Sequence, residues 1–161
     1  MKIIFFIAIL FVSSSAFSQH EGDSIYKRCP VSVKDTATGN NYFIEHQQAT
    51  VKTYRNKGNY TIVIEQKNQF FTMFFRDSKF STKRKSTYRI SPDANNNDEL
   101  SAKYSFRSGE SVAFIDVSSG KAETTYDKTT KLWHVKATGL IANMGDTRVT
   151  YFKATADFYV R

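Results

Sequence analysis

The chain has 161 residues with a formal net charge of +8, and 40% of its residues are hydrophobic. This size allows one domain with a substantial hydrophobic core. The single cysteine, Cys29, excludes a fold stabilised by internal disulfide bonds, so packing has to stabilise the domain. We expect Cys29 itself to act as a small, partly buried apolar residue near the N-terminus.

The first eighteen residues predict an export signal. Lys2 is followed by ten apolar residues, 3–12, and then by mostly small residues that end in Ala16, Phe17 and Ser18. This pattern is typical of a secretory signal peptide with cleavage before Gln19. The apolar run is shorter than the roughly 20 residues that a membrane-spanning helix needs, and no later run is longer. We therefore expect a secreted or periplasmic protein with no integral membrane span and a single domain over residues 19–161.

The remainder of the chain has the alternating pattern of β-strands. Phe and Tyr are abundant, at 14 and 9 residues. Residues 60–66, 100–108, 132–142 and 147–160 each place apolar side chains on one face and polar side chains on the other. Turn residues separate the strands at 38–41, 56–59, 76–79, 108–109, 118–121, 127–131 and 143–146, and residues 91–99 form a long polar loop. Residues 42–48 are ambiguous and could form a short helix.

This pattern predicts an all-β fold, an antiparallel β-sandwich of about nine strands. The alternative is a small up-and-down β-barrel of the lipocalin-like kind, although the G-x-W motif near the start of that fold is absent. Within the sheet, residues 70–75 are apolar on both faces, so we expect both faces of this strand to be covered. We expect a turn at 76–79 and a return strand over 80–90, which together make a hairpin.

Basic residues are concentrated between positions 52 and 90. This segment contains ten Lys and Arg residues but only two acidic residues, Glu65 and Asp77. A polyanion surface there would use Lys83, Lys85, Arg89, Arg76, Lys79, Arg55 and Lys57. In a meander, the turns at 56–59 and 76–79 lie at the same end of the sheet. Four of these residues, Arg55, Lys57, Arg76 and Lys79, should therefore lie near that end. The partner would be an anionic glycan or lipopolysaccharide. Nucleic acid is disfavoured because the neighbouring aromatics have the parity of core residues. The alternative is an ordinary solvated strand face.

No motif for catalysis, metal binding or phosphate binding occurs, and no cofactor is expected. The three histidines are far apart in sequence, and neither H-E-x-x-H nor G-x-S-x-G is present. Two carboxylates from different strands could still form a catalytic pair. The candidates are Glu45, Glu65, Asp116, Glu123 and Asp157. Trp133 has core parity beside Val135, so we expect it to be buried rather than to form a sugar-binding platform.

These observations favour an exported, non-catalytic β-domain that acts as a binding or scaffolding module at the cell envelope or outside the cell. The first alternative is a carrier of a small apolar ligand. The second alternative is a polyanion-binding protein that uses the basic segment 52–90.

Overall fold

The computed structural model describes residues 19–76, 84–144 and 148–161, and these contain ten β-strands and no helix. The all-β prediction is therefore confirmed, with one strand more than expected. The expected signal peptide lies outside the described residues. The strands are β1 (Gln19–Tyr26), β2 (Val31–Asp35), β3 (Ala49–Asn56), β4 (Asn59–Gln66), β5 (Gln69–Phe75), β6 (Lys85–Ile90), β7 (Glu99–Ser108), β8 (Ser111–Asp127), β9 (Leu132–Met144) and β10 (Val149–Val160).

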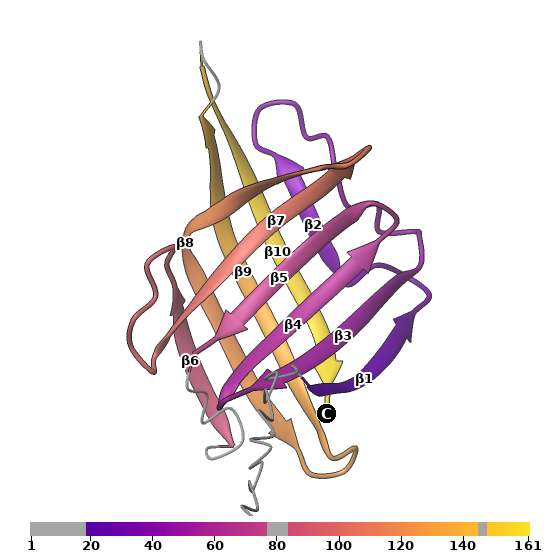
Figure 1. Ribbon diagram of the computed structural model, residues 1–161, viewed down its shortest axis with the longest axis vertical. Helices are drawn as coiled ribbons and strands as arrows, with labels where there is room; N and C mark the ends of the chain where they lie inside the picture. Colours follow the sequence, from indigo (N-terminus) through magenta and orange to yellow (C-terminus); the bar gives the residue numbers. More distant parts are fainter. Residues whose placement is uncertain (1–18, 77–83, 145–147) are drawn as a thin grey trace, which may run out of the picture.

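All ten strands belong to one sheet, in the order β1-β3-β4-β5-β7-β6-β8-β9-β10-β2. The sheet curls into a half-barrel, so that β3, β4, β5 and β7 lie in front of β9, β10 and β2 (Figure 1). It therefore combines the two facing layers expected of a sandwich with the continuous curl of a barrel. The sheet is mixed rather than purely antiparallel, because β6 and β7 form a short parallel pairing at Arg89↔Glu99 and Ile90↔Leu100.

Strand β8 forms the corner between the two layers. Its first residues pair with β7, and the residues from Val117 onward pair with β9, with a shift in register between Val117 and Ser119. Gly120 lies opposite Gly139, and a Cβ atom on Gly120 would be only 2.4 Å from the Thr138 carbonyl oxygen. The turn predicted at 118–121 is therefore wrong. The strand bends there without ending, because a bulge and two glycines let the backbones approach closely.

The predicted hairpin between residues 70–75 and 80–90 is also wrong. Strand β5 pairs with β4 and β7, whereas β6 pairs with β8. Strand β7 pairs with β5 over seven residues, and β6 pairs with β8 over six. The prediction that both faces of β5 are covered is also incorrect. Phe71, Met73 and Phe75 are buried, but the side chains at 70, 72 and 74 are only half-buried.

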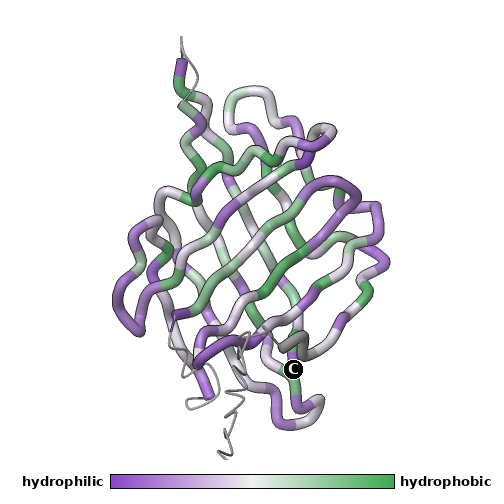
Figure 2. The backbone as a smooth tube through the Cα atoms, in the orientation of Figure 1, coloured by the Kyte–Doolittle hydropathy of each residue, from purple (hydrophilic) through white to green (hydrophobic). Residues whose placement is uncertain are grey.

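The hydrophobic core lies between the two layers, and the alternating faces predicted from the sequence supply it. Figure 2 shows hydrophobic residues within the strands and hydrophilic residues at most of the turns. Tyr60, Ile62 and Ile64 on β4 are fully buried, and the even-numbered residues 152–160 on β10 are buried as well. Trp133 and Cys29 are also buried, as expected, at 7% exposure each. Residues 42–48 form turns and no helix.

Candidate functional site

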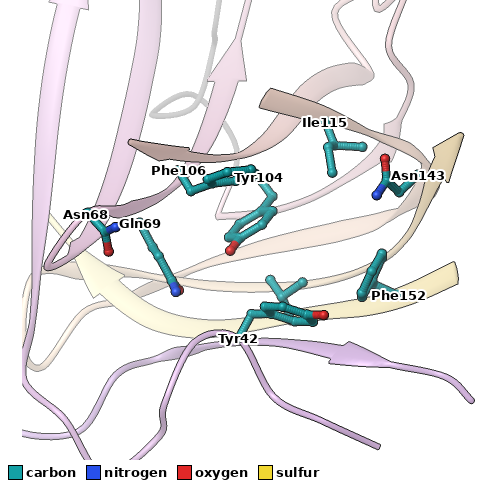
Figure 3. Close-up of a pocket in the computed structure, with 9 residues that line it drawn as sticks. Tyr42, Asn68, Gln69, Tyr104, Phe106, Ile115, Asn143 and Phe152 are labelled. Carbon is teal, nitrogen blue, oxygen red and sulfur yellow. The ribbon is translucent and has the colours of Figure 1, made fainter. Parts of the chain in front are cut away.

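A partly open cavity of about 320 Å³ lies between the two layers of the sheet (Figure 3). It is at the end of the molecule where β4 turns into β5, where β7 nears its C-terminal end and where β10 begins. Nine residues line it: Val33, Tyr42, Asn68, Gln69, Tyr104, Phe106, Ile115, Asn143 and Phe152. They come from six strands and two connecting segments, so the cavity exists only in the folded chain.

Strands β7 and β8 form one wall of the cavity. Tyr104 and Phe106 are two residues apart on β7 and therefore point to the same side of the sheet. Their ring centroids are 6.2 Å apart. Ile115 pairs directly with Tyr104 across the two strands. Figure 3 shows these three side chains on one side of the cavity, facing Tyr42 and Phe152 on the other.

The opposite wall combines β2, β10 and the segment after β2. The rings of Tyr42 and Phe152 meet edge to face, with centroids 5.4 Å apart. The backbone N–H of Tyr42 donates a hydrogen bond to the carbonyl oxygen of Val33 at 2.9 Å, which holds Tyr42 against β2. Val33 itself is 1% exposed and pairs with Ala154 of β10. The wall is therefore aromatic and is tied to the sheet by backbone hydrogen bonds.

Polar atoms are few in the cavity. The Oε1 atom of Gln69 is buried and has no hydrogen-bond partner among the described residues. Asn68 differs, because its Nδ2 atom donates to the carbonyl oxygen of Arg107 at 2.9 Å. A buried acceptor without a partner costs about 1–3 kcal/mol, so Gln69 is a point where a bound molecule with an N–H or O–H group would gain stability.

The cavity lining carries no charge. None of its nine residues is acidic or basic. Burial raises the pKa of Tyr104 to about 12, and the nearby Tyr42 adds a smaller increase. The Tyr104 phenol is therefore neutral at physiological pH, and it offers a hydroxyl group rather than an anion. Such a lining fits an uncharged ligand.

Exposed apolar side chains surround the same end of the molecule. Large hydrophobic residues with more than a third of their surface exposed there include Tyr42, Ile44, Phe106, Val112, Phe114, Leu140, Met144, Val149 and Tyr151. Met144 and Val149 pair with each other on the β9–β10 hairpin. Val112, Phe114, Leu140 and Tyr151 alternate with inward-facing residues and therefore lie on the outer face of the sheet, so only Tyr42 and Phe106 of this set line the cavity.

The structure separates the residues predicted for a polyanion surface. Lys79 and Lys83 lie outside the described residues. Arg55 and Lys57 lie at the β3–β4 turn, and Arg76 follows Phe75, which pairs with Tyr60 beside that turn. These three residues therefore lie at one end of the molecule, whereas Lys79, the fourth residue predicted there, lies outside the described residues. Lys85 begins β6. Arg89 is distant from the turn and forms an ion pair with the buried Glu99.

Of the five candidate carboxylates, Glu45 and Asp157 line one open hollow together with Cys29 and Lys136. Four of them have basic partners: Glu65 with Lys52 at 2.7 Å, Asp116 with Lys103 at 3.3 Å, Glu123 with Lys121 at 2.7 Å, and Asp157 with His134 at 2.5 Å. Glu45 is exposed beside Cys29, whose pKa is raised mainly by burial of the thiol. Within the described residues, no group of three or more His, Cys, Asp or Glu side chains could hold a metal ion.

The sequence analysis offered a carrier of a small apolar ligand as an alternative, but it named no residue as part of a ligand cavity. The alternation over residues 100–108 places Tyr104 and Phe106 on one face, and the partial exposure of Phe106 marks where that face leaves the core. Asn68, Gln69 and Asn143 lie near turns, where polar residues are ordinary, so nothing in the sequence distinguishes them.

Comparison with family models, with curated proteins and with solved structures finds no match for this chain. In the described part of the chain, no helix is long and apolar enough to cross a membrane.

Proposed function

We propose that this protein binds a small, uncharged and largely apolar molecule in the cavity between the two layers of its sheet. The observation that carries the proposal is the cavity itself, about 320 Å³ in volume and lined by aromatic and aliphatic side chains without any charge. Ligand sites are commonly of this kind: apolar, of a few hundred cubic ångströms, and with a few polar groups that orient the ligand.

The ligand carries at least one hydrogen-bond donor. Gln69 Oε1 is the acceptor that lacks a partner, and Tyr104 adds a neutral hydroxyl group in the same cavity. A ligand with a hydroxyl or amide N–H satisfies Gln69, whereas a pure hydrocarbon leaves it unpaired. The ligand class is therefore a small amphiphile, apolar over most of its surface.

The role is binding rather than catalysis. The cavity lining contains no carboxylate, histidine, lysine or cysteine that could act as an acid, base or nucleophile. The export expected from residues 1–18 would place this binding outside the cytoplasm.

A fluorescent titration tests the proposal. The uncharged dye N-phenyl-1-naphthylamine should bind the protein with increased emission, and Ile115→Phe should weaken binding about tenfold or more because the larger side chain fills the cavity. Val112→Phe is the matched control on the same strand, since Val112 is 54% exposed and does not line the cavity. If the dye does not bind, or if both variants bind it as well as the original protein does, the cavity is not the binding site.

A second titration tests the hydrogen bond. Competition by 1-naphthol and by 1-methylnaphthalene compares two ligands of similar shape, only one of which has a donor. The naphthol should bind about tenfold tighter, and Gln69→Leu should remove this preference. A preference that persists in Gln69→Leu would show that Gln69 does not contact the ligand.

A further inference from the structure

The end of the molecule opposite the cavity carries a second feature, a set of basic side chains from separate parts of the chain. We define the basic end by eight residues: Arg55, Lys57, Arg76, Arg84, Lys85, Lys128, Lys131 and Arg161. Apart from the half-buried Arg55, all are exposed. Four of them, at positions 84, 128, 131 and 161, were not among the residues predicted for a polyanion surface.

Contacts between neighbouring elements place these residues at one end. The hydroxyl of Tyr60 donates to the carbonyl oxygen of Arg161 at 2.9 Å, which joins the end of the chain to the β3–β4 turn. The Arg55 guanidinium lies 5.0 Å from the centroid of the same Tyr60 ring. The backbone N–H of Tyr126 donates to the carbonyl oxygen of Arg84 at 2.8 Å, beside the β8–β9 turn. In Figure 1 these turns lie at the lower end of the molecule.

The two ends are opposite because the same strands connect them. Strand β4 runs from the β3–β4 turn to Gln66, next to the cavity residues Asn68 and Gln69. Strand β9 likewise runs from the β8–β9 turn to Met144, one residue past Asn143 of the cavity. A molecule bound at the basic end would therefore leave the mouth of the cavity open.

Positive charge outweighs negative charge at the basic end, although Glu123 lies near Lys85. On the rest of the surface, Lys52, Lys103, Lys121, Lys136 and Arg89 form ion pairs with carboxylates. At the basic end, Lys57, Lys128 and Lys131 form no ion pair with any described residue. Asp127 is the acidic side chain of the β8–β9 turn, and its Oδ1 already accepts the backbone N–H groups of Thr129 and Thr130.

We propose that the basic end binds an anionic polysaccharide. The charges are distributed over two turns, the end of β5, the start of β6 and the end of the chain, which suits a polymer with repeated sulfate, phosphate or carboxylate groups. Single-stranded nucleic acid fits less well, because its binding uses exposed aromatic rings for stacking. Tyr60, Phe75 and Trp133 at this end are at most 7% exposed, and the more exposed ring of Tyr159 is already stacked on His134, with centroids 4.4 Å apart. This inference is independent of the ligand in the cavity.

Heparin fragments are the probe, titrated at several salt concentrations. The test variant combines Lys57→Asn, Lys128→Gln and Lys131→Asn. Asparagine is used at 57 and 131 because both have positive φ angles, of 48° and 57°, which asparagine tolerates. The control combines Lys67→Asn, also at a positive φ of 54°, with Arg107→Gln and Lys153→Gln, which removes the same charge away from the basic end.

The test variant should bind heparin at least about tenfold more weakly at 0.1 M salt. The slope of log affinity against log salt should be less steep by about two to three, as expected when three charges are lost. The control should lose less than about threefold. Equal losses in the two variants would show that net charge alone determines binding and would overturn the proposal. So would an absence of heparin binding, or tighter binding to a single-stranded oligonucleotide of equal charge.

Discussion

The side chain of Gln66 forms two hydrogen bonds with the backbone of Ile44, 22 residues earlier in the chain. The N–H of Ile44 donates to Gln66 Oε1 at 3.0 Å, and Gln66 Nε2 donates to the carbonyl oxygen of Ile44 at 2.9 Å. Gln66 is 4% exposed. This pair connects the end of β4 to the segment that carries Tyr42 and Phe43, so it holds one wall of the cavity in place.

Replacing Gln66 should therefore affect both stability and binding. In Gln66→Leu, the N–H and carbonyl groups of Ile44 lose their partners, and we expect a loss of about 1–3 kcal/mol in the free energy of unfolding. Affinity for N-phenyl-1-naphthylamine should fall as well, because Tyr42 is held less firmly. Urea unfolding and dye titration measure the two effects. Gln48→Leu, at an exposed position, is the control and should change neither; equal effects in both variants would contradict this role of Gln66.

The corner of β8 should be intolerant of even one methyl group. A Cβ at Gly120 would lie 2.4 Å from the Thr138 carbonyl oxygen and 2.6 Å from the Gly139 Cα atom. We expect Gly120→Ala to lower the free energy of unfolding by about 1–3 kcal/mol through overpacking. Gly22→Ala is a suitable control, because Gly22 has a similar φ of 152° but nothing within 4 Å of its added Cβ. Thermal or urea unfolding of the two variants would separate the steric effect from the backbone effect.

Alkaline pH should destabilise the protein partly through Tyr104. Burial raises the pKa of Tyr104 to about 12 in the folded protein, whereas the unfolded chain keeps the ordinary tyrosine value of 10.0. Below pH 10 the phenol is neutral in both states. As the pH rises from 10 to 12, the unfolded state loses its proton first, so stability falls, by up to about 2 kcal/mol.

Tyr104→Phe removes this contribution and is the way to measure it. Between pH 9 and pH 11.5 the variant should lose less stability than the original protein in urea unfolding. Other groups titrate in the same range, so the difference between the two proteins is the informative quantity. Parallel loss of stability in both would contradict the raised pKa.

The ion pair between Arg89 and Glu99 should stabilise the folded protein, and Arg89 should not contribute to polyanion binding. Glu99 is 4% exposed, and its Oε2 also accepts the backbone N–H of Asn95 at 3.0 Å, so the carboxylate organises the loop before β7. Arg89→Gln should reduce the free energy of unfolding by about 1 kcal/mol, since the Arg89 side chain is largely exposed. Heparin affinity should change less than about threefold. A loss as large as that of the basic-end variant would place Arg89 in the binding surface after all.

Much of the fold could be predicted because side chains alternate along a strand. The buried faces of β4, β7, β9 and β10 follow from residues such as Ile62, Val135 and Phe158, whose parity is visible in the sequence and agrees with their burial. The exposure of Lys85 and Arg89 on β6 follows in the same way. These are local properties, since each depends on a few neighbouring residues and on a period of two.

Strand partners and binding sites depend on contacts between distant residues, which alternation does not encode. Strand β7 lies between β5 and β6 in the sheet, and residues 118–121 continue a strand in which Gly120 lies opposite Gly139. The cavity needs Tyr42, Gln69, Phe106 and Phe152 to come together from four elements. The sequence by itself thus determined which side chains face the core. Only the tertiary structure decided where the two layers separate to form a cavity and which positive charges meet at the opposite end, because both result from the curl of the whole sheet.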